Sequence, residues 1–163
     1  MKRLAVAFTG PSNSGKTTLI VNISTVLQEQ GYKVCVVKHD PKDKARFDKE
    51  GKDSYKFSQT GADVAVVSPK KTTLLKQSTS SIDSIIDLFG EFDYLLVEGL
   101  KTLPLPRIAV FRNSLDKNYF EVTDAIATDD TIKSDTLPKA CEHLNLNDYT
   151  QIIQWIDLHG KKV

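Results

Sequence analysis

A glycine-rich segment near the start of the chain has the residue types needed to bind a polyphosphate. It reads Gly10-Pro11-Ser12-Asn13-Ser14-Gly15-Lys16-Thr17 and matches the pattern G-x-x-x-x-G-K-[ST]. Such a loop turns backbone N–H groups toward phosphate oxygens, and its two fixed glycines allow the close approach and the backbone angles that this requires. Lys16 would bring its ammonium group to the β- and γ-phosphates, and Thr17 would offer its hydroxyl to Mg²⁺. The segment predicts a nucleoside triphosphate site that extends from Gly10 to Thr18.

A second acidic residue suited to this site follows an apolar run later in the chain. The run Tyr94-Leu95-Leu96-Val97 ends in Glu98-Gly99. P-loop proteins hold Mg²⁺ with a second acid at the end of a buried strand, usually Asp. We therefore predict Lys16 and Glu98 as catalytic residues and Thr17 and Glu98 as metal ligands, with Gly99 leaving room beside the phosphates. The alternative for Glu98 is an ordinary strand-end acid that faces solvent.

The elements that must position these motifs follow from the apolar pattern. Continuous apolar runs at 4–8, 34–37 and 94–97 are typical of strands buried in a parallel sheet. Apolar residues at helical spacing from 19 to 27, with a stop at Gly31, predict a helix that joins the first two strands in a βαβ unit. Further helices are predicted at 54–60, 81–89 and 148–158, and further strands at 65–67, 72–75, 107–111 and 125–128.

This alternation predicts one α/β domain over residues 1–163, with a three-layer P-loop NTPase fold and a mostly parallel, mixed central sheet. The strands that contain Leu4, Val34 and Tyr94 should be neighbours. Glu98 should then approach the phosphate loop, because open α/β sheets bind ligands at the carboxyl ends of their strands.

Composition narrows the class of partner. The 22 basic and 21 acidic side chains give a net charge of +1, which creates no overall field that would attract nucleic acid or an anionic membrane. Cys35 and Cys141 are too far apart in sequence to suggest a disulfide framework or a metal cluster. Met1 to Arg3 lead directly into a short strand, without the apolar region of a signal peptide. We expect a cytoplasmic protein that binds neither nucleic acid nor membranes.

Considered together, the motifs resemble those of the MobB family, which acts in molybdopterin guanine dinucleotide biosynthesis. The matching segments occur in order along nearly the whole chain. They are the early P-loop, Val37-Lys38-His39, Asp48, Gly51-Lys52-Asp53-Ser54-Tyr55, Gly61-Ala62, Val97-Glu98-Gly99-Leu100-Lys101, Pro106-Arg107-Ile108 and Arg112.

The resemblance implies GTP binding with weak hydrolysis, a homodimer, and assistance to a molybdenum cofactor guanylyltransferase that joins GMP to molybdopterin. One segment departs from the family pattern. Family members tend to carry several histidines after the Lys-His pair, whereas Asp40-Pro41-Lys42 follows His39 here. A role that depends on a histidine cluster is therefore not supported.

Further residues are candidates for a cofactor or phosphate pocket, and each has a structural alternative. A lone His39 at a strand end is more often a hydrogen-bonded structural residue than a site residue, and Asp53 or Ser54 would also cap a helix that begins at Tyr55. Basic side chains bind phosphate well but are solvated surface charges by default. The candidates are His39, Lys52, Asp53, Ser54, Lys101, Arg107 and Arg112.

Asp129 is a candidate for reading the base. It follows the predicted strand 125–128, and its carboxylate would accept the N1–H and N2–H groups that guanine presents and adenine lacks. The alternative is an ordinary turn-forming aspartate.

Two other functional classes use the same loop. A small-molecule kinase would add an arginine-rich lid over the phosphates, and the four arginines of this chain form no cluster in sequence. A GTPase that delivers nickel would need a histidine-rich segment, and the three histidines are scattered. No arginine lies in or immediately beside the three site motifs, which predicts slow hydrolysis by the chain alone.

Overall fold

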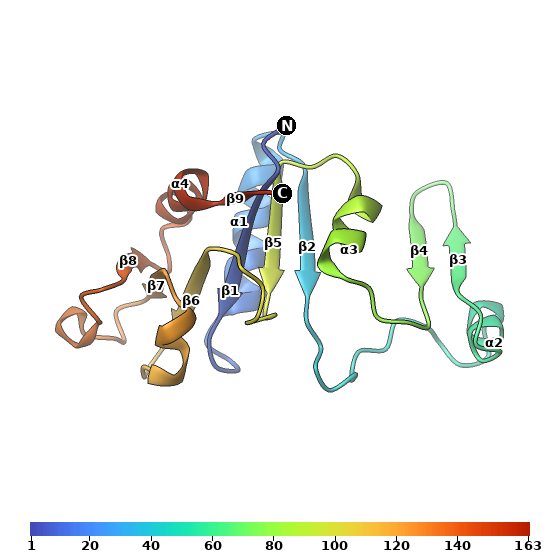
Figure 1. The fold of residues 1–163 in the computed structure, drawn as a ribbon, viewed down its shortest axis with the longest axis horizontal. Coiled ribbons are helices and arrows are strands. Elements are labelled where there is room, and N and C mark those ends of the chain that lie inside the picture. Colours follow the sequence, from blue (N-terminus) through green and yellow to red (C-terminus); the bar gives the residue numbers. More distant parts are fainter. The chain divides into compact units, whose positions relative to one another are not determined.

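The chain forms two compact units in a computed structural model that describes residues 1–163 (Figure 1). The first unit comprises Met1–His39 and Phe89–Val163, and the second comprises Asp40–Leu88. The phosphate loop, Glu98 and Asp129 all belong to the first unit. That residues 1–163 act as one nucleotide-binding domain stays a prediction.

A mostly parallel sheet forms the centre of the first unit (Figure 1). The short strand β9 (Lys161–Lys162) pairs antiparallel with the start of β1, and every other pairing in this sheet is parallel. The order is β2 (Val34–Lys38), β5 (Tyr94–Glu98), β1 (Leu4–Thr9), β6 (Arg107–Phe111), β7 (Ala125–Thr128) and β8 (Glu142–Asn145). The predicted α/β class with a mixed sheet is confirmed, and so is the predicted neighbourhood of β1, β2 and β5.

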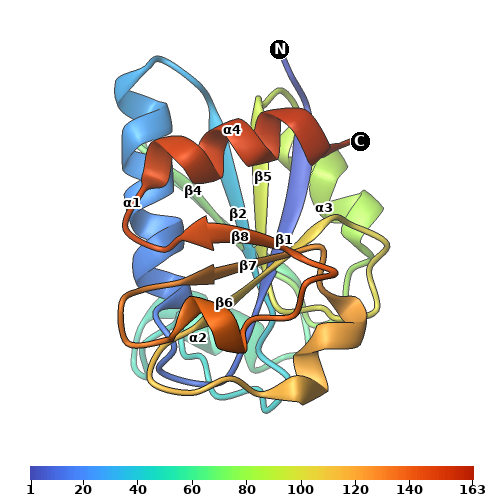
Figure 2. The same ribbon diagram turned by 90° about the vertical axis from the view of Figure 1, so that its left-hand side faces the viewer.

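Helices α1 (Lys16–Glu29) and α4 (Tyr149–His159) cover one face of this sheet (Figure 2). Apolar residues of both helices share a core with alternate residues of β1, including Val6 and Phe8. On the other face, the 3₁₀ helix η1 (Lys117–Val122) packs Tyr119 and Phe120 edge-on against Phe111. A second 3₁₀ helix, η2 (Ser134–Thr136), leads to Leu137 in the same cluster. The sheet is therefore the middle one of three layers.

Local signals explain where the helices begin and end. Leu19, Ile20, Ile23 and Leu27 of α1 are buried at the helical spacing seen in the sequence, and Gly31 follows the helix with φ +85°. In α4 the Asp148 carboxylate accepts a hydrogen bond from the Gln151 N–H at 2.9 Å, as its predicted capping role requires.

Two expectations need correction at the sheet edges. The segment 34–37 was expected to be a buried strand, but β2 is an edge strand in which Val37 is buried and Val36 is 44% exposed. Strand β8, at the opposite edge, was not predicted, because Leu144 is its only buried side chain and leaves almost no apolar pattern.

The second unit contains the predicted short elements. Strands β3 (Val64–Val67) and β4 (Thr72–Leu75) form an antiparallel hairpin. In the chain, α2 (Asp53–Ser58) precedes this hairpin and α3 (Ile82–Phe89) follows it. The last residue of α3, Phe89, already belongs to the first unit. The structural alternative for Asp53 and Ser54, a cap on a helix that begins at Tyr55, is wrong, since α2 already begins at Asp53 and has no side-chain cap. None of the chain's helices has both the length and the hydropathy needed to span a bilayer.

Candidate nucleotide-binding site

The phosphate loop connects β1 to α1 in a conformation that depends on glycine. Gly10 and Gly15 have φ angles of +132° and +97°. A Cβ atom at Gly10 would lie 2.4 Å from the backbone oxygen of Val110, so β6 leaves no space for a side chain there. The loop is therefore shaped by the neighbouring strand as well as by its own sequence.

The side chain of Lys16 turns back toward the backbone of the phosphate loop. Its ammonium group donates hydrogen bonds to the carbonyls of Gly10 at 2.9 Å and Pro11 at 2.6 Å. Burial lowers the pKa of Lys16, and the Glu98 carboxylate partly opposes this effect. A half-buried cation at the amino end of a 14-residue helix favours binding of an anion.

Ser14 supplies a second indication that the loop accepts a polar ligand. Its side chain is 3% exposed, and its hydroxyl has no hydrogen-bond partner in the protein. Buried hydroxyls are normally paired, because an unpaired one costs about 1–3 kcal/mol. A phosphate oxygen in the loop would give this hydroxyl the partner it lacks.

Thr17 and Glu98 approach each other as the topology predicted. The Thr17 hydroxyl donates to the two carboxylate oxygens of Glu98 at 3.3 and 3.4 Å. Residues Phe8 and Glu98 stand opposite each other in the β1–β5 register, which brings the strand end to the loop. These hard oxygen donors suit Mg²⁺, which takes few protein ligands and completes its shell with phosphate oxygens and water.

Lys16, Thr17 and Glu98 line one cavity of about 460 Å³. It brings together predicted residues from the loop, from the end of β5 and from the end of β6. The lining residues are Ser12, Asn13, Gly15, Lys16, Thr17, Thr18, Lys38, Glu98 and Arg112.

Lys38 is the member of this set that was not predicted as a site residue. It ends β2 opposite Glu98 in the parallel register, and its ammonium group lies 3.5 Å from a Glu98 oxygen. The signal was present in the sequence, since a charged residue directly follows each of the apolar runs 34–37 and 94–97. Adjacent parallel strands place such ends side by side.

Gly99 lies against His39, and that it leaves room beside the phosphates stays a prediction. A Cβ atom on Gly99, whose φ is +91°, would lie 3.0 Å from the Cβ atom of His39. The glycine therefore makes room for His39, which is exposed and whose backbone N–H donates to the Glu98 carbonyl at 3.0 Å. His39 stands next to the Glu98 strand end and does not line the cavity.

Arg107 and Lys101 lie outside the phosphate cavity. Arg107 is only 1% exposed, and its guanidinium donates to the carbonyls of Gly99, Leu100 and Leu103 at 3.0–3.1 Å. The ammonium group of Lys101 stands 3.7 Å from the centre of the Tyr119 ring. These contacts favour a structural part for both side chains, and a phosphate contact stays a prediction.

The remaining candidates have other partners. In the second unit, Ser54 donates to Asp48 at 2.9 Å, Asp53 pairs with Lys56 at 3.2 Å, and Lys52 precedes α2 as its N-cap. Asp129 holds Arg112, with 3.0 Å between Arg112 Nε and Asp129 Oδ2. That Asp129 reads the base stays a prediction.

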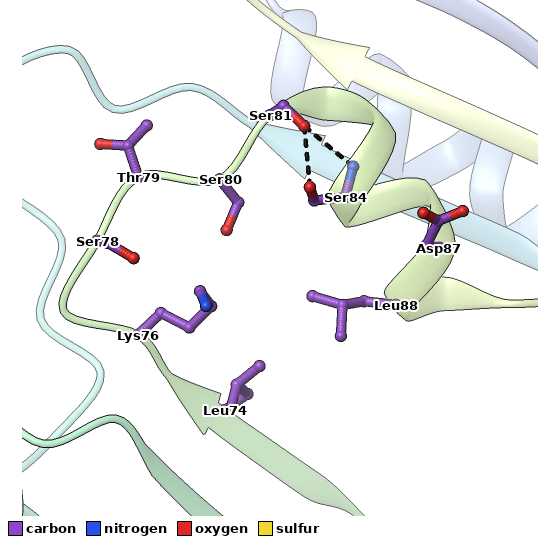
Figure 3. Close-up of a pocket in the computed structure, with 9 residues that line it drawn as sticks. All are labelled: Leu74, Lys76, Ser78, Thr79, Ser80, Ser81, Ser84, Asp87 and Leu88. Carbon is purple, nitrogen blue, oxygen red and sulfur yellow. Dashed lines mark hydrogen bonds between the residues drawn. The ribbon is translucent and has the colours of Figure 1, made fainter.

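A larger cavity of about 690 Å³ lies in the second unit, between the end of β4 and α3 (Figure 3). Two of its hydroxyls already serve the fold. Ser81 accepts from the Ser84 N–H at 3.1 Å, which caps α3, and the two hydroxyls pair at 3.0 Å. Lys76, its one basic residue, lies 3.5 Å from Asp63. Size alone therefore does not make it the better candidate site.

Several known proteins are similar to this chain. The family model described as "Molybdopterin guanine dinucleotide synthesis protein B" matches residues 5–129. The molybdopterin-guanine dinucleotide biosynthesis adapter protein of Haemophilus influenzae is 30% identical over 161 residues, covering 93% of this chain and 86% of that protein. A probable adapter protein of the same name from Bacillus subtilis is 32% identical over 126 residues, or 75% of this chain and 73% of the relative. The crystal structure of Bacillus subtilis MobB superimposes with a TM-score of 0.75 and 27% identity, covering 98% of this chain and 99% of that one.

Proposed function

This chain belongs to the MobB family of adapter proteins in molybdopterin guanine dinucleotide biosynthesis, and we propose that it serves this pathway by binding GTP and Mg²⁺ in its phosphate loop. In this proposal GTP occupies the cavity lined by Lys16, Thr17 and Glu98, and hydrolysis is slow. The nucleotide-loaded protein, a homodimer, assists a molybdenum cofactor guanylyltransferase that attaches GMP to molybdopterin.

One observation carries the nucleotide part of the proposal. The half-buried Lys16 ammonium and the Thr17–Glu98 oxygens lie around one cavity, and the loop that carries Lys16 also holds the unpaired Ser14 hydroxyl. Lys16 and the backbone N–H groups would hold the phosphates, and Thr17 and Glu98 would hold Mg²⁺, which neutralises phosphate charge when bound.

The adapter reading is favoured over a small-molecule kinase. The sequence places no arginine in or beside the site motifs, but in the structure Arg112 lines the phosphate cavity although it is far from the loop in sequence. A single arginine, tied to Asp129, is still not an arginine-rich lid. We therefore keep the expectation that the chain alone turns GTP over far below the ~1–10³ per second typical of enzymes.

Two finer points belong to the same proposal. The preference for GTP over ATP rests on family membership, and equal affinities for the two nucleotides would contradict it. A cytoplasmic location is consistent with two free cysteines, because thiols persist in reducing compartments.

The proposal is tested by reconstitution with a guanylyltransferase that acts on molybdopterin. Adding this protein should increase formation of the dinucleotide cofactor, and Lys16→Ala should remove the increase. Lys162→Ala is the charge-matched control, since Lys162 pairs opposite Leu4 at the other end of β1. Fast phosphoryl transfer by the purified chain to a small acceptor, or full stimulation by Lys16→Ala, would show the adapter proposal to be wrong.

A further inference from the structure

Arg112 reaches the phosphate loop from a distant part of the chain. It is the first residue after β6, and its side chain lies against Gly15: a Cβ atom there would be 3.4 Å from Arg112 Nε and 3.5 Å from Cζ. Arg112 also lines the phosphate cavity with Lys16 and Thr17. A 39% exposed side chain in this place is accessible to a ligand in the loop.

The orientation of the guanidinium is set by Asp129. The Asp129 carboxylate is 16% exposed and lies 3.0 Å from Arg112 Nε through its Oδ2 atom. Its other oxygen accepts hydrogen bonds from the hydroxyl and the backbone N–H of Thr131. The Thr131 hydroxyl in turn accepts from the Asn113 N–H at 2.7 Å. Asp129 is thus fixed on one side by Thr131 while it holds Arg112 on the other.

This arrangement uses only part of the hydrogen-bonding capacity of Arg112. A guanidinium has five N–H donors in a rigid plane, and the contact with Asp129 is an ion pair with 3.0 Å between Nε and Oδ2. No protein acceptor takes the terminal NH₂ groups. Two such groups match the spacing of two phosphate oxygens, and a planar fork held from behind loses little freedom when it binds.

We propose that Arg112 contacts the phosphate groups of the bound nucleotide, and that Asp129 is the positioning residue that aims Arg112 at them. The proposal rests on nucleotide binding by the phosphate loop, as stated above. It gives Asp129 an effect on affinity that acts through Arg112 and does not depend on the base.

The test is a titration of the purified chain with Mg²⁺-GTP and Mg²⁺-ATP. Arg112→Ala should lower the affinity for both nucleotides by about 10- to 100-fold, as expected for lost hydrogen bonds to a charged group. Arg112→Lys should recover only part of this loss, because an ammonium cannot bind bidentately. Lys162→Ala, at the opposite end of β1, should change nothing.

Asp129 variants separate positioning from base reading. Asp129→Asn should lower the affinities for GTP and ATP by the same factor, so that the ratio of the two affinities is unchanged. In an Arg112→Ala background it should have almost no further effect on either affinity. A changed GTP to ATP ratio would assign Asp129 to the base and overturn its positioning role. Thermal unfolding of each variant shows whether the fold is retained, and Arg112→Lys keeps the test decisive where Asp129→Asn is unstable.

The outcomes distinguish this inference from the proposed function. If Arg112→Ala binds within twofold of the wild type while Lys16→Ala does not bind, the inference on Arg112 is wrong and the proposed function stands. If Lys16→Ala also binds normally, the phosphate loop itself is not the nucleotide site.

Discussion

At the scale of single residues, the site depends on a few oxygen atoms. Thr17→Ala or Glu98→Gln removes one of the two groups that would hold Mg²⁺. We expect GTP affinity to become nearly independent of Mg²⁺, while Mg²⁺ still strengthens binding to the wild type. The measurement is GTP titration with Mg²⁺ and with EDTA, with Thr25→Ala as the hydroxyl control on α1 outside the cavity. Unchanged Mg²⁺ dependence in both variants would exclude this pair as the metal ligands.

Arg107 makes the contrasting case of a buried charge that serves the fold. Removing its guanidinium in Arg107→Met leaves the carbonyls of Gly99, Leu100 and Leu103 without their donor. We expect a loss of about 2–4 kcal/mol in the free energy of unfolding, because buried polar groups are costly when unpaired. Urea unfolding measures it, and Arg46→Met, an exposed arginine that donates to Asp43 and Ala45, is the control. A loss under about 0.5 kcal/mol would contradict this structural role.

At the scale of elements, the phosphate loop is shaped by β6. Gly10→Ala would place a methyl group 2.4 Å from the Val110 carbonyl oxygen. Gly31→Ala is a matched control, since Gly31 also has a positive φ but nothing lies within 4 Å of its added Cβ. We expect about 1 kcal/mol of destabilisation for Gly31→Ala from backbone strain alone, and clearly more for Gly10→Ala together with loss of nucleotide binding. Equal effects in thermal unfolding would mean that β6 does not restrict the loop.

The same elements show what the sequence reveals and what it hides. The loop, α1 and the buried strands β1 and β5 were predictable, because each has a local motif or apolar pattern over adjacent residues. Strand β8, with only Leu144 buried, has no such pattern. The contact of Arg112 with Gly15 could not be predicted either, because it depends on β6 pairing beside β1, with Ala7 opposite Arg107.

At the scale of the whole molecule, the proposed homodimer needs an exposed apolar surface. The β3–β4 hairpin offers one on the face that carries Val67 and Leu74, which are exposed by 75% and 45%. A two-stranded sheet has two free edges and is marginal alone, so a second copy is a natural cover. We expect Val67→Lys to shift the protein toward monomer in light scattering after gel filtration, while exposed Leu158→Lys leaves the dimer intact. A wild-type chain that stays monomeric at tens of micromolar would contradict the dimer.

The Val110 carbonyl that closes on Gly10 also has a consequence for biosynthesis. A ribosome completes the whole phosphate-binding motif by residue 17, yet the strand that moulds it is made about a hundred residues later. During most of translation, the nascent chain therefore contains the motif but not the β6 strand against which the loop packs. We expect nucleotide to bind only to chains in which β6 has already joined the sheet. Nucleotide binding to the nascent chain would therefore mark the step at which β6 assembles.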